Sequence, residues 1–523
     1  MVAKHLVFVV ATLGTTLTAL SQSNEATTGF KGCDALLDSG LNDIVVFPGS
    51  SAYNTSMSTY YSSENRRVQP WCIVQPRSAQ QVSTVVQALG NVSGAGHWGV
   101  AVRSGGHGYT GSNAIRYGVI IDLTFLNSTE LVQASHDNEA SHWNGTSVIS
   151  TPIARIHPAA KWGNIISYLE QYNLSVTGGR SGDVGAAGLL LAGGISYHSQ
   201  LWGMSCDNVI NYEVVLANGS IIEANRHHNK DLFRALKGGG NNFGIVTRFD
   251  MRTFTLPPDG VYGGLMVPTW DSVDTVKHQF VDYVHSIGMG SHDHEFVVWR
   301  SNGTDHNMMV MTVSTDGNKA SPNFLPFDNI STDYDFRALQ PLSNLAASTS
   351  DTGGSYDMAF VLTLQATMDI MDKCEEVFLS LAKDVKQAQI PLSITAVFQP
   401  LPKHLASASS DGNVLGLKQN LPDSSIIFDI GGTLEDSAIE YEGVAYSKLA
   451  KAVEELRLFS AARERHSSYV YMNYANPEQD TIGSYGNDNV EFLKYVAAKY
   501  DAHGFFQYRV SGGAKLSRAG YHD

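Results

Sequence analysis

One histidine of this chain lies in a glycine-dense segment. The segment consists of Arg103, Ser104, Gly105, Gly106, His107, Gly108 and Tyr109, directly after an apolar run that predicts a strand over Val100 to Val102. Its successive backbone N–H groups can face an anion because no Cβ atom obstructs them, and the cation of Arg103 adds to the attraction. A pyrophosphate fits that description. The alternative is a tight turn with an incidental histidine.

Two further glycine-rich segments favour the anion site. The first, over 178 to 194, supplies the candidates Ser181, Gly182, Asp183, Gly185, Gly188 and Gly193. The second, over 238 to 246, supplies the candidates Gly240, Asn242, Gly244, Ile245 and Val246. It runs into a predicted strand, where small residues let the backbone approach a flat ring closely. Together the segments predict a site for a phosphate-bearing ligand with a planar ring.

The ordinary dinucleotide-binding fingerprint does not explain these segments. Gly106, Gly108 and Gly111 formally satisfy its spacing. That motif requires a helix directly afterwards, with the pyrophosphate at the N-terminus of the helix. Here the next predicted element is another strand, over Val119 to Leu123. A Rossmann domain is therefore excluded on context.

Motifs at both ends of the chain identify a family resemblance. The segments RSGGHGYTG, GRSGDVG, WGMSCDNV, KGGGNNFGIVT, YMNYAN, KYDAHGFFQ and GGAKL are similar to those of the FAD-linked oxidases of the vanillyl-alcohol oxidase and berberine-bridge-enzyme type, in particular their secreted fungal branch. FQPLP and DGNVLGL resemble the substrate domain of that family. The resemblance implies an α+β fold with an FAD-binding domain of the PCMH type and a substrate domain that has an antiparallel sheet covered by helices.

The resemblance also implies how FAD is held. His107 matches the residue that bonds covalently to the 8α-methyl group of the flavin. Bicovalent members carry a second link from a cysteine in the segment that matches 178 to 185, where this chain has Ser181. We therefore expect a single covalent link. Many oligosaccharide oxidases are bicovalent, so a smaller, partly apolar secondary metabolite is favoured as the substrate.

Two tyrosines are candidates for the proton acceptor. Tyr471 matches a family position on the substrate side of the flavin, and its phenol is expected to act as the base or to orient the substrate hydroxyl. A phenol has an ordinary pKa near 10, so it needs a cationic or hydrogen-bonding neighbour to act near neutral pH. The alternative for Tyr471 is a packed aromatic at a domain junction. Tyr197 is a weaker candidate, and Asn473 is expected to hydrogen-bond the flavin.

The chain of 523 residues is too long for a single core, and its texture changes after Pro257 and Pro258. Short predicted strands and helices precede this point, whereas longer strands and amphipathic helices follow it. From about Ser467 glycine-rich motifs and short strands are expected to return. The predicted organisation is a signal peptide over 1–21, an FAD-binding domain over 22–257, a substrate domain over 258–466 and a tail over 467–523 that rejoins the first domain.

The charge and the N-terminal sequence limit which kinds of partner this chain can have. A formal net charge of -15 argues against nucleic acid. Lys4 followed by an apolar, Thr-containing run from Leu6 to Leu20 is typical of a signal peptide, and it is short for a membrane anchor. We expect a secreted monomer with no membrane or nucleic-acid partner.

An oxidising compartment makes the cysteines informative. Cys33 and Cys72 are predicted to pair, which would contribute about 4 kcal/mol in the chain-entropy picture, while Cys206 and Cys374 are predicted to be buried free thiols. Sequons fit a glycoprotein, although several can be unoccupied; they lie at Asn54, Asn91, Asn127, Asn144, Asn173, Asn218, Asn302 and Asn329.

Other polar clusters predict less. The run from His292 to Glu295 has ligand-type residues but no evident further partners for zinc, so it is interpreted as a solvated loop, as is the pair His227 and His228. No metal site is predicted. No Gly-x-Ser-x-Gly elbow occurs, which removes the commonest signature of a secreted hydrolase.

The leading functional hypothesis is an FAD-dependent oxidase. It would move hydride from an alcohol or amine carbon of a small molecule to flavin N5, and O2 would then reoxidise the flavin and give hydrogen peroxide. Alternatives are a carbohydrate oxidase or a dehydrogenase on the same scaffold, and a flavin-containing cyclase or binding protein without net redox chemistry.

Overall fold

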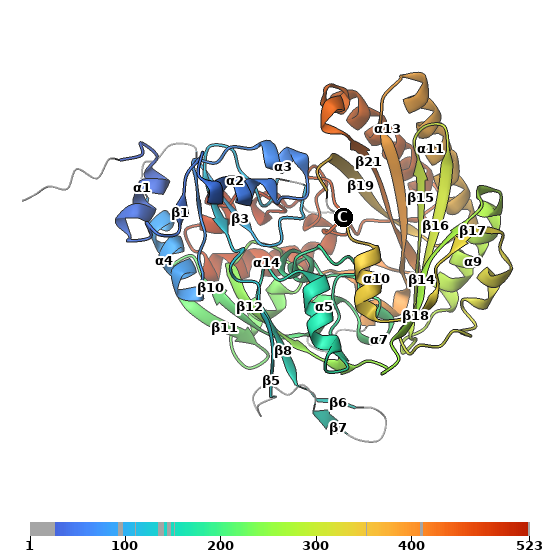
Figure 1. The fold of residues 1–523 in the computed structure, drawn as a ribbon, viewed down its shortest axis with the longest axis horizontal. Coiled ribbons are helices and arrows are strands. Elements are labelled where there is room, and N and C mark those ends of the chain that lie inside the picture. The colour runs from blue at the N-terminus through green and yellow to red at the C-terminus, as the bar shows by residue number, and fades with distance from the viewer. Residues whose placement is uncertain are drawn as a thin grey trace, which may run out of the picture.

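The computed structural model describes residues 27–92, 98–109, 111–133, 141–143, 148–150, 152–351, 353–407 and 412–520. The predicted signal peptide and the sequon at Asn144 lie outside these residues. The described chain forms two lobes (Figure 1).

A four-stranded sheet begins the first lobe. Its order is β1-β2-β4-β3, with β2, β4 and β3 parallel and β1 antiparallel. Its elements are α1 (Lys31–Asp38), β1 (Val45–Val46), α2 (Ser51–Ser58), α3 (Ser63–Arg67), β2 (Cys72–Val74), α4 (Ala79–Gly90), β3 (Val100–Arg103) and β4 (Val119–Asp122). Helix α4 begins after Ser78, because the Ser78 hydroxyl accepts the Gln81 N–H at 3.2 Å and so caps the first turn. Apolar residues of α1, α4 and the sheet share one core.

A five-stranded antiparallel sheet completes the first lobe, with the order β11-β10-β12-β8-β5. Its strands are β5 (Thr129–Val132), β8 (Ile153–Ile156), β10 (Val209–Val215), β11 (Ile221–Asn225) and β12 (Ile245–Arg252). Between and beside them lie β6 (Ser141–Trp143), β7 (Val148–Ser150), α5 (Trp162–Glu170), β9 (Leu174–Ser175), α6 (Ala186–Leu191), α7 (Ser199–Trp202), α8 (Lys230–Leu236) and β13 (Phe254–Thr255). The loop after β3 carries the first glycine-dense segment, and no helix occurs among its described residues, as the exclusion of a Rossmann domain requires.

The second lobe is built on a nine-stranded antiparallel sheet with the order β17-β14-β16-β15-β20-β21-β19-β22 and β18 beside β14. Its strands are β14 (Val261–Pro268), β15 (Asp293–Ser301), β16 (His306–Ser314), β17 (Thr332–Asp335), β18 (Ala338–Gln340), β19 (Tyr356–Gln365), β20 (Ser393–Leu401), β21 (Ser425–Leu434) and β22 (His466–Ser467). Its helices are α9 (Val273–Ser286), α10 (Leu342–Ser348), α11 (Met368–Gln387), α12 (Leu417–Asn420) and α13 (Glu442–Ala461). Figure 1 shows α9, α11 and α13 on the side of the sheet that faces away from the first lobe.

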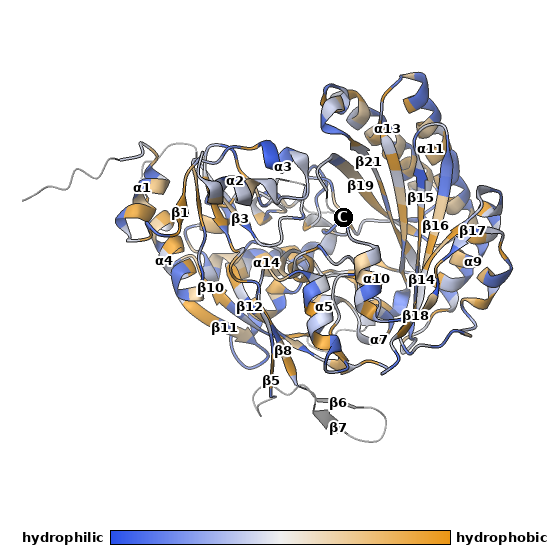
Figure 2. Cartoon of the chain, in the orientation of Figure 1, coloured by the Kyte–Doolittle hydropathy of each residue, from blue (hydrophilic) through white to orange (hydrophobic). Residues whose placement is uncertain are grey.

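Strand alternation gives this sheet two different faces. Along β19, residues such as Phe360 and Leu362 pack into the core under the helices, whereas Val361 joins the core of the first lobe. The central strands are strongly apolar (Figure 2). The face toward the first lobe is therefore free to carry polar groups between its apolar residues.

The C-terminal tail packs against the first lobe, but through a helix rather than strands. Val490, Leu493 and Val496 of α14 (Asn487–Tyr500) lie in one core with Leu232 and Leu236 of α8. After Ser467 no strand occurs among the residues that the structure describes, so the expected return of short strands is wrong. The reason is that the glycine-rich tail motifs form turns around a single amphipathic helix. The boundaries at 257 and 466 stay predictions.

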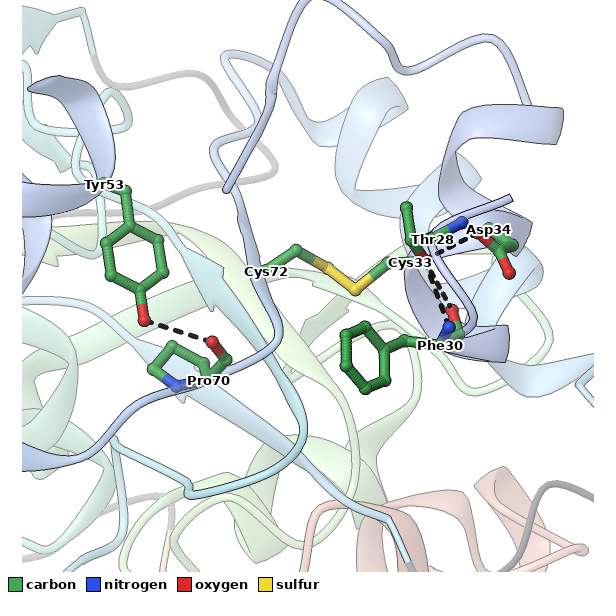
Figure 3. Close-up of a disulfide and its surroundings, with 7 residues drawn as sticks. All are labelled: Thr28, Phe30, Cys33, Asp34, Tyr53, Pro70 and Cys72. Carbon is green, nitrogen blue, oxygen red and sulfur yellow. Dashed lines mark hydrogen bonds between the residues drawn. A yellow bond between two sulfur atoms is a disulfide. The ribbon is translucent and has the colours of Figure 1, made fainter. Parts of the chain in front are cut away.

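The predicted disulfide is confirmed, since Cys33 of α1 is bonded to Cys72 of β2 (Figure 3). Cys206 and Cys374 are buried free thiols, as predicted, and Cys206 lies in a short 3-10 helix that leads directly into β10. The sequon asparagines within the described residues are all exposed or partly exposed: Asn54, Asn91, Asn127, Asn173, Asn218, Asn302 and Asn329.

The interpretation of residues 292–295 as a solvated loop is wrong. Asp293, His294 and Glu295 begin strand β15 and are 6%, 0% and 0% exposed. The polar residues did not indicate a strand in the sequence, because the apolar surroundings of this central strand come from neighbouring elements and not from residues 293–295 themselves.

Every helix among the described residues is too short or too polar to span a bilayer.

Candidate active site

A cavity of about 790 Å³ contains most of the predicted site residues. From the first lobe it is lined by Ser104, Gly105, Gly106, His107, Gly108, Ser181, Gly185, Gly188, Gly240, Gly244, Ile245 and Val246, and from the tail by Tyr471 and Asn473. The face of the nine-stranded sheet toward the first lobe supplies the other side, with Phe296, Val298, Val397 and Asp429 among its lining residues. Segments far apart in the sequence thus share one cavity.

The first two glycine-rich segments touch each other. A Cβ at Gly105 would lie 2.5 Å from the Cα of Gly185, and the reverse substitution meets the same obstacle. Lys161 joins the segments, because its Nζ donates to the carbonyl oxygens of Gly105, at 2.6 Å, and of Asp183. Burial lowers the pKa of Lys161. Close backbone contact therefore requires glycine at both positions.

His107 projects from this contact into the cavity. Its ring stacks on Tyr61 with centroids 4.1 Å apart, and its Nε2 lies 3.3 Å from Oδ2 of Asp183. Asp183 itself does not line the cavity. Its carboxylate contacts the histidine instead.

Arg103 is placed differently from the expectation. Its side chain is buried beneath the loop, where its NH1 donates to the carbonyl oxygen of Ser56 and its NH2 donates to Oγ1 of Thr59 at 2.8 Å. The guanidinium also lies 4.0 Å from the centroid of the Tyr60 ring. Its charge is thus directed at α2 and not at the cavity. Arg103 therefore ties the glycine-dense loop to α2 instead of facing a ligand.

Three other predicted contact residues also have structural surroundings and lie outside the cavity lining. Gly182 donates its N–H to the carbonyl of Ala346 at 2.9 Å. Gly193 has φ +98° and packs against Leu415. The Asn242 amide bonds the carbonyl oxygens of Gly239 and Ala514, at 2.8 and 2.9 Å, and so ties the third segment to the tail. From the sequence alone, these three positions could not be distinguished from the neighbouring residues that line the cavity.

The two tyrosines of the motif at 471–474 have different partners. Tyr471 receives a hydrogen bond from the Asn473 amide at 3.0 Å, whereas the hydroxyl of Tyr474 receives one from NH2 of Arg180 at 2.8 Å. Burial raises the pKa of both phenols, and Arg180 acts to lower them. Tyr474 therefore has the direct cationic partner that a tyrosine base requires.

Tyr197 does not line the cavity. It is 3% exposed and packs among apolar residues, with its ring edge toward His294. Burial raises its pKa to about 12. The weaker candidate for the base is thus a core residue behind the site.

Two carboxyl groups on the sheet were missed by the sequence. Asp429 of β21 lies between Val361 of β19 and Val397 of β20 in the strand register, and its Oδ1 is inaccessible with no hydrogen-bond partner among the described residues. Burial raises its pKa to about 7. Asp357 of β19 also lines the cavity, and burial, partly offset by a hydrogen bond from Thr433, raises its pKa to about 6. Carboxyl groups with near-neutral pKa values mark a cavity as a candidate active site.

These surroundings fit a flavin dinucleotide. One wall offers backbone of three glycine-rich segments, in which Gly105, Gly185 and Gly244 lie too close to neighbouring backbone to carry a Cβ. It also offers His107, whose Nδ1 has no hydrogen-bond partner among the described residues, and the other wall offers groups that can exchange protons. Among the described residues the cluster with metal-ligand geometry is Asp274, Asp372 and Glu375, and Lys277 occupies its centre through three ion pairs.

Known proteins agree with this assignment. Residues 70–225 match the family described as FAD binding domain. The FAD-dependent monooxygenase sdcF of Emericella nidulans is 32% identical over 93% of this chain and 98% of its own length, and the FAD-dependent monooxygenase FUP4 of Fusarium proliferatum is 34% identical over 88% and 87%. The chain belongs to the FAD-linked oxidoreductases of the vanillyl-alcohol oxidase and berberine-bridge-enzyme type.

Solved structures of this family share the fold. A variant of berberine bridge enzyme, in complex with (S)-reticuline, matches with a TM-score of 0.70 at 16% identity, over 94% of this chain and 99% of its own. Chitooligosaccharide oxidase matches with a TM-score of 0.70 at 18% identity, over 94% and 100%. These structures confirm the predicted α+β class, and the curated relatives confirm the family and show that the chain is an FAD-linked oxidoreductase.

Some signals in the sequence could have found the missed residues. Arg180 and Tyr474 directly adjoin predicted site residues, within the segments GGRSGDVG and YMNY. Asp429 is the lone charge in the apolar run SIIFDIGG. A charge inside an apolar strand indicates a buried polar site, but its partners are known only once the strands are paired.

Proposed function

We propose that this protein is a secreted oxidase that removes hydride from an alcohol or amine carbon of a small, partly apolar molecule. FAD, bound along the glycine-rich wall and linked through His107, supplies hydride acceptance at N5 and reoxidation by O2 to give hydrogen peroxide. The observation that carries the proposal is the placement of the Asp429 carboxyl across a single cavity from that wall.

Asp429 is the proton acceptor in this proposal. With a pKa of about 7 the carboxyl is partly ionised at neutral pH, and one of its oxygens has no partner within the described chain. A base with a pKa near the working pH is most effective. Tyr474, held by Arg180, orients the substrate hydroxyl or amine toward Asp429, and Tyr471 with Asn473 fixes the tail beside the cofactor.

Arg180 sets the geometry of the polar groups. Its NH1 donates to Oε1 of Gln399 on β20 and its NH2 to Tyr474 of the tail. The guanidinium also lies 4.8 Å from the ring centroid of Phe296 on β15. One cation thus connects the glycine segment, the sheet and the tail, so that the substrate is held in a fixed orientation relative to Asp429.

The lining of the sheet supports a small substrate with both apolar and hydroxyl or amine groups. Phe296, Val298 and Val397 provide apolar area, and Thr395 and Gln399 provide hydrogen bonds. A carbohydrate, as in the chitooligosaccharide oxidase neighbour, would lie against the apolar side chains of Phe296, Val298 and Val397. The Cys33–Cys72 bond and the accessible sequons support secretion.

An anaerobic substrate screen monitored by flavin absorbance tests the proposal. Bleaching by an alcohol or amine, followed by one hydrogen peroxide per product in air, supports an oxidase. Bleaching without peroxide indicates a dehydrogenase, and no bleaching indicates a cyclase or binding protein. Because the relatives are named monooxygenases, the turnover is repeated in 18O2, where incorporation of label into the product together with loss of peroxide would overturn the oxidase.

A further inference from the structure

The ring of His107 is held in a way that leaves one nitrogen free. Tyr61 stacks on its face at an interplanar angle of 16°, and Asp183 lies 3.3 Å from Nε2. Within the described residues Nδ1 has no hydrogen-bond partner, and the histidine lines the cavity. The nitrogen that is free to react is therefore the one opposite the carboxylate.

Asp183 is held in turn by its own loop. The Ser181 hydroxyl lies 2.6 Å from Oδ1 of Asp183 and 2.9 Å from the carbonyl oxygen of Thr349, so it bridges the loop to the second lobe. Lys161 bonds the backbone carbonyl of Asp183. Burial tends to raise the pKa of Asp183, but the hydrogen bonds from His107 and Ser181 outweigh it, so the pKa is lowered and the group is ionised at neutral pH.

An ionised carboxylate accepts hydrogen bonds and cannot donate them. Its neighbour Nε2 of His107 must then carry the proton, and the neutral imidazole has its lone pair at Nδ1. The serine suits this arrangement, because its hydroxyl has a hydrogen to donate to Asp183, whereas the cysteine sulfur of bicovalent members is bonded to the flavin and has none. The same substitution that removes the second covalent link thus supports the first.

We propose that Asp183, held by Ser181, is a positioning residue that keeps His107 in the tautomer able to attack the flavin methyl group and stabilises the charge that the ring gains. The inference rests on the proposed covalent link. It assigns a purpose to Ser181 and Asp183 that does not require either side chain to touch the flavin.

Formation of the covalent bond is a two-electron oxidation, and O2 is the oxidant. Nδ1 of His107 becomes bonded to the methyl carbon, and one methyl C–H bond breaks. Two electrons pass to the flavin ring system and then to O2. The O2 takes up two protons, one from the methyl group and one from the imidazole, and leaves as hydrogen peroxide. Before the imidazole proton leaves, the alkylated ring is positively charged, and Asp183 at 3.3 Å stabilises it.

The test compares covalent with total flavin in the full-length protein. Wild type, Asp183→Asn, Ser181→Ala and the control Ser350→Ala are expressed, and the flavin that survives denaturation is followed over time against the flavin bound in the native protein. Ser350 is a matched control because its hydroxyl supports the same loop, through Gly182 N–H at 3.1 Å, and has no contact with His107.

Asp183→Asn is expected to keep its total flavin and to form the covalent bond at least about tenfold more slowly, by analogy with the loss of a carboxylate that orients a reactive histidine. Ser181→Ala is expected to slow it less, and Ser350→Ala not at all. Covalent loading of Asp183→Asn at the wild-type rate would overturn the inference while leaving the link intact. Wild-type flavin that dissociates completely would instead overturn the link itself. If Asp183→Asn bound no flavin at all, an unchanged rate in Ser181→Ala would decide against the inference.

Discussion

The two walls of the cavity are built in opposite ways. The wall from the first lobe is mostly backbone, since Gly105 and Gly185 approach so closely that neither can carry a Cβ. The wall from the sheet is made of side chains, such as Asp429 and Val397, on paired strands. A backbone wall suits a cofactor that stays the same, because it permits almost no substitution. A side-chain wall suits a substrate, because single substitutions reshape it without disturbing the fold.

The largest expected effect is on the backbone wall. Gly105→Val places a side chain against the backbone of Gly185, which cannot move aside, so the two loops must separate. We expect complete loss of bound flavin, measured by absorbance of the purified protein. Gly443→Ala is the control, since a Cβ there meets nothing within 4 Å. Wild-type flavin content in Gly105→Val would show that the wall is less rigid than its contacts indicate.

The next effect is on chemistry at the side-chain wall. Asp429→Asn removes the proposed proton acceptor, and we expect kcat to fall by about 10²-fold to 10⁴-fold with flavin content unchanged. In wild type kcat/KM should rise with pH to a plateau above about 7, because the carboxyl acts when ionised, and this limb should vanish in the variant. Asp333→Asn, exposed on β17, should change neither. A variant that keeps wild-type kcat would shift the role to Tyr474.

A smaller effect is expected on substrate choice. Val397→Phe enlarges a lining side chain beside Asp429 and should raise KM for the best substrate by about 10-fold to 200-fold, the range for steric discrimination in apolar pockets. Covalent flavin should stay at the wild-type level. If both KM and flavin changed together, the two walls would not be separable as described.

The last effect concerns stability. Burial raises the pKa of Asp429 from its ordinary value to about 7, so the folded protein prefers the protonated carboxyl. The stabilisation is complete at pH values below the ordinary Asp pKa near 3.9 and is lost as pH rises to about 7. The free energy of unfolding of wild type should therefore fall over that window relative to Asp429→Asn, by up to about 4 kcal/mol. If stability changed with pH in the same way in both proteins, the Asp429 carboxyl would be better solvated than its surroundings indicate.

The same contrast explains which predictions succeeded. The glycine segments were found from sequence because their requirement is local: a residue without Cβ is visible as a letter. The start of helix α4 is set in the same local way, since Ser78 and Gln81 are close in the chain. The loop predicted over 292–295 failed because the burial of His294 and Glu295 depends on strands and helices that are distant in sequence.

By itself the sequence determined the cofactor, the family, the histidine of the cavity and the pairing of Cys33 with Cys72. Only the tertiary structure decided that Arg103 faces away from the cavity, that Arg180 holds Tyr474, and that Asp429 faces the glycine wall. The physical reason is the distance along the chain over which each property is determined. Backbone conformation is set by neighbours in the chain, whereas the environment of a charged side chain is set by whichever strands and loops fold around it.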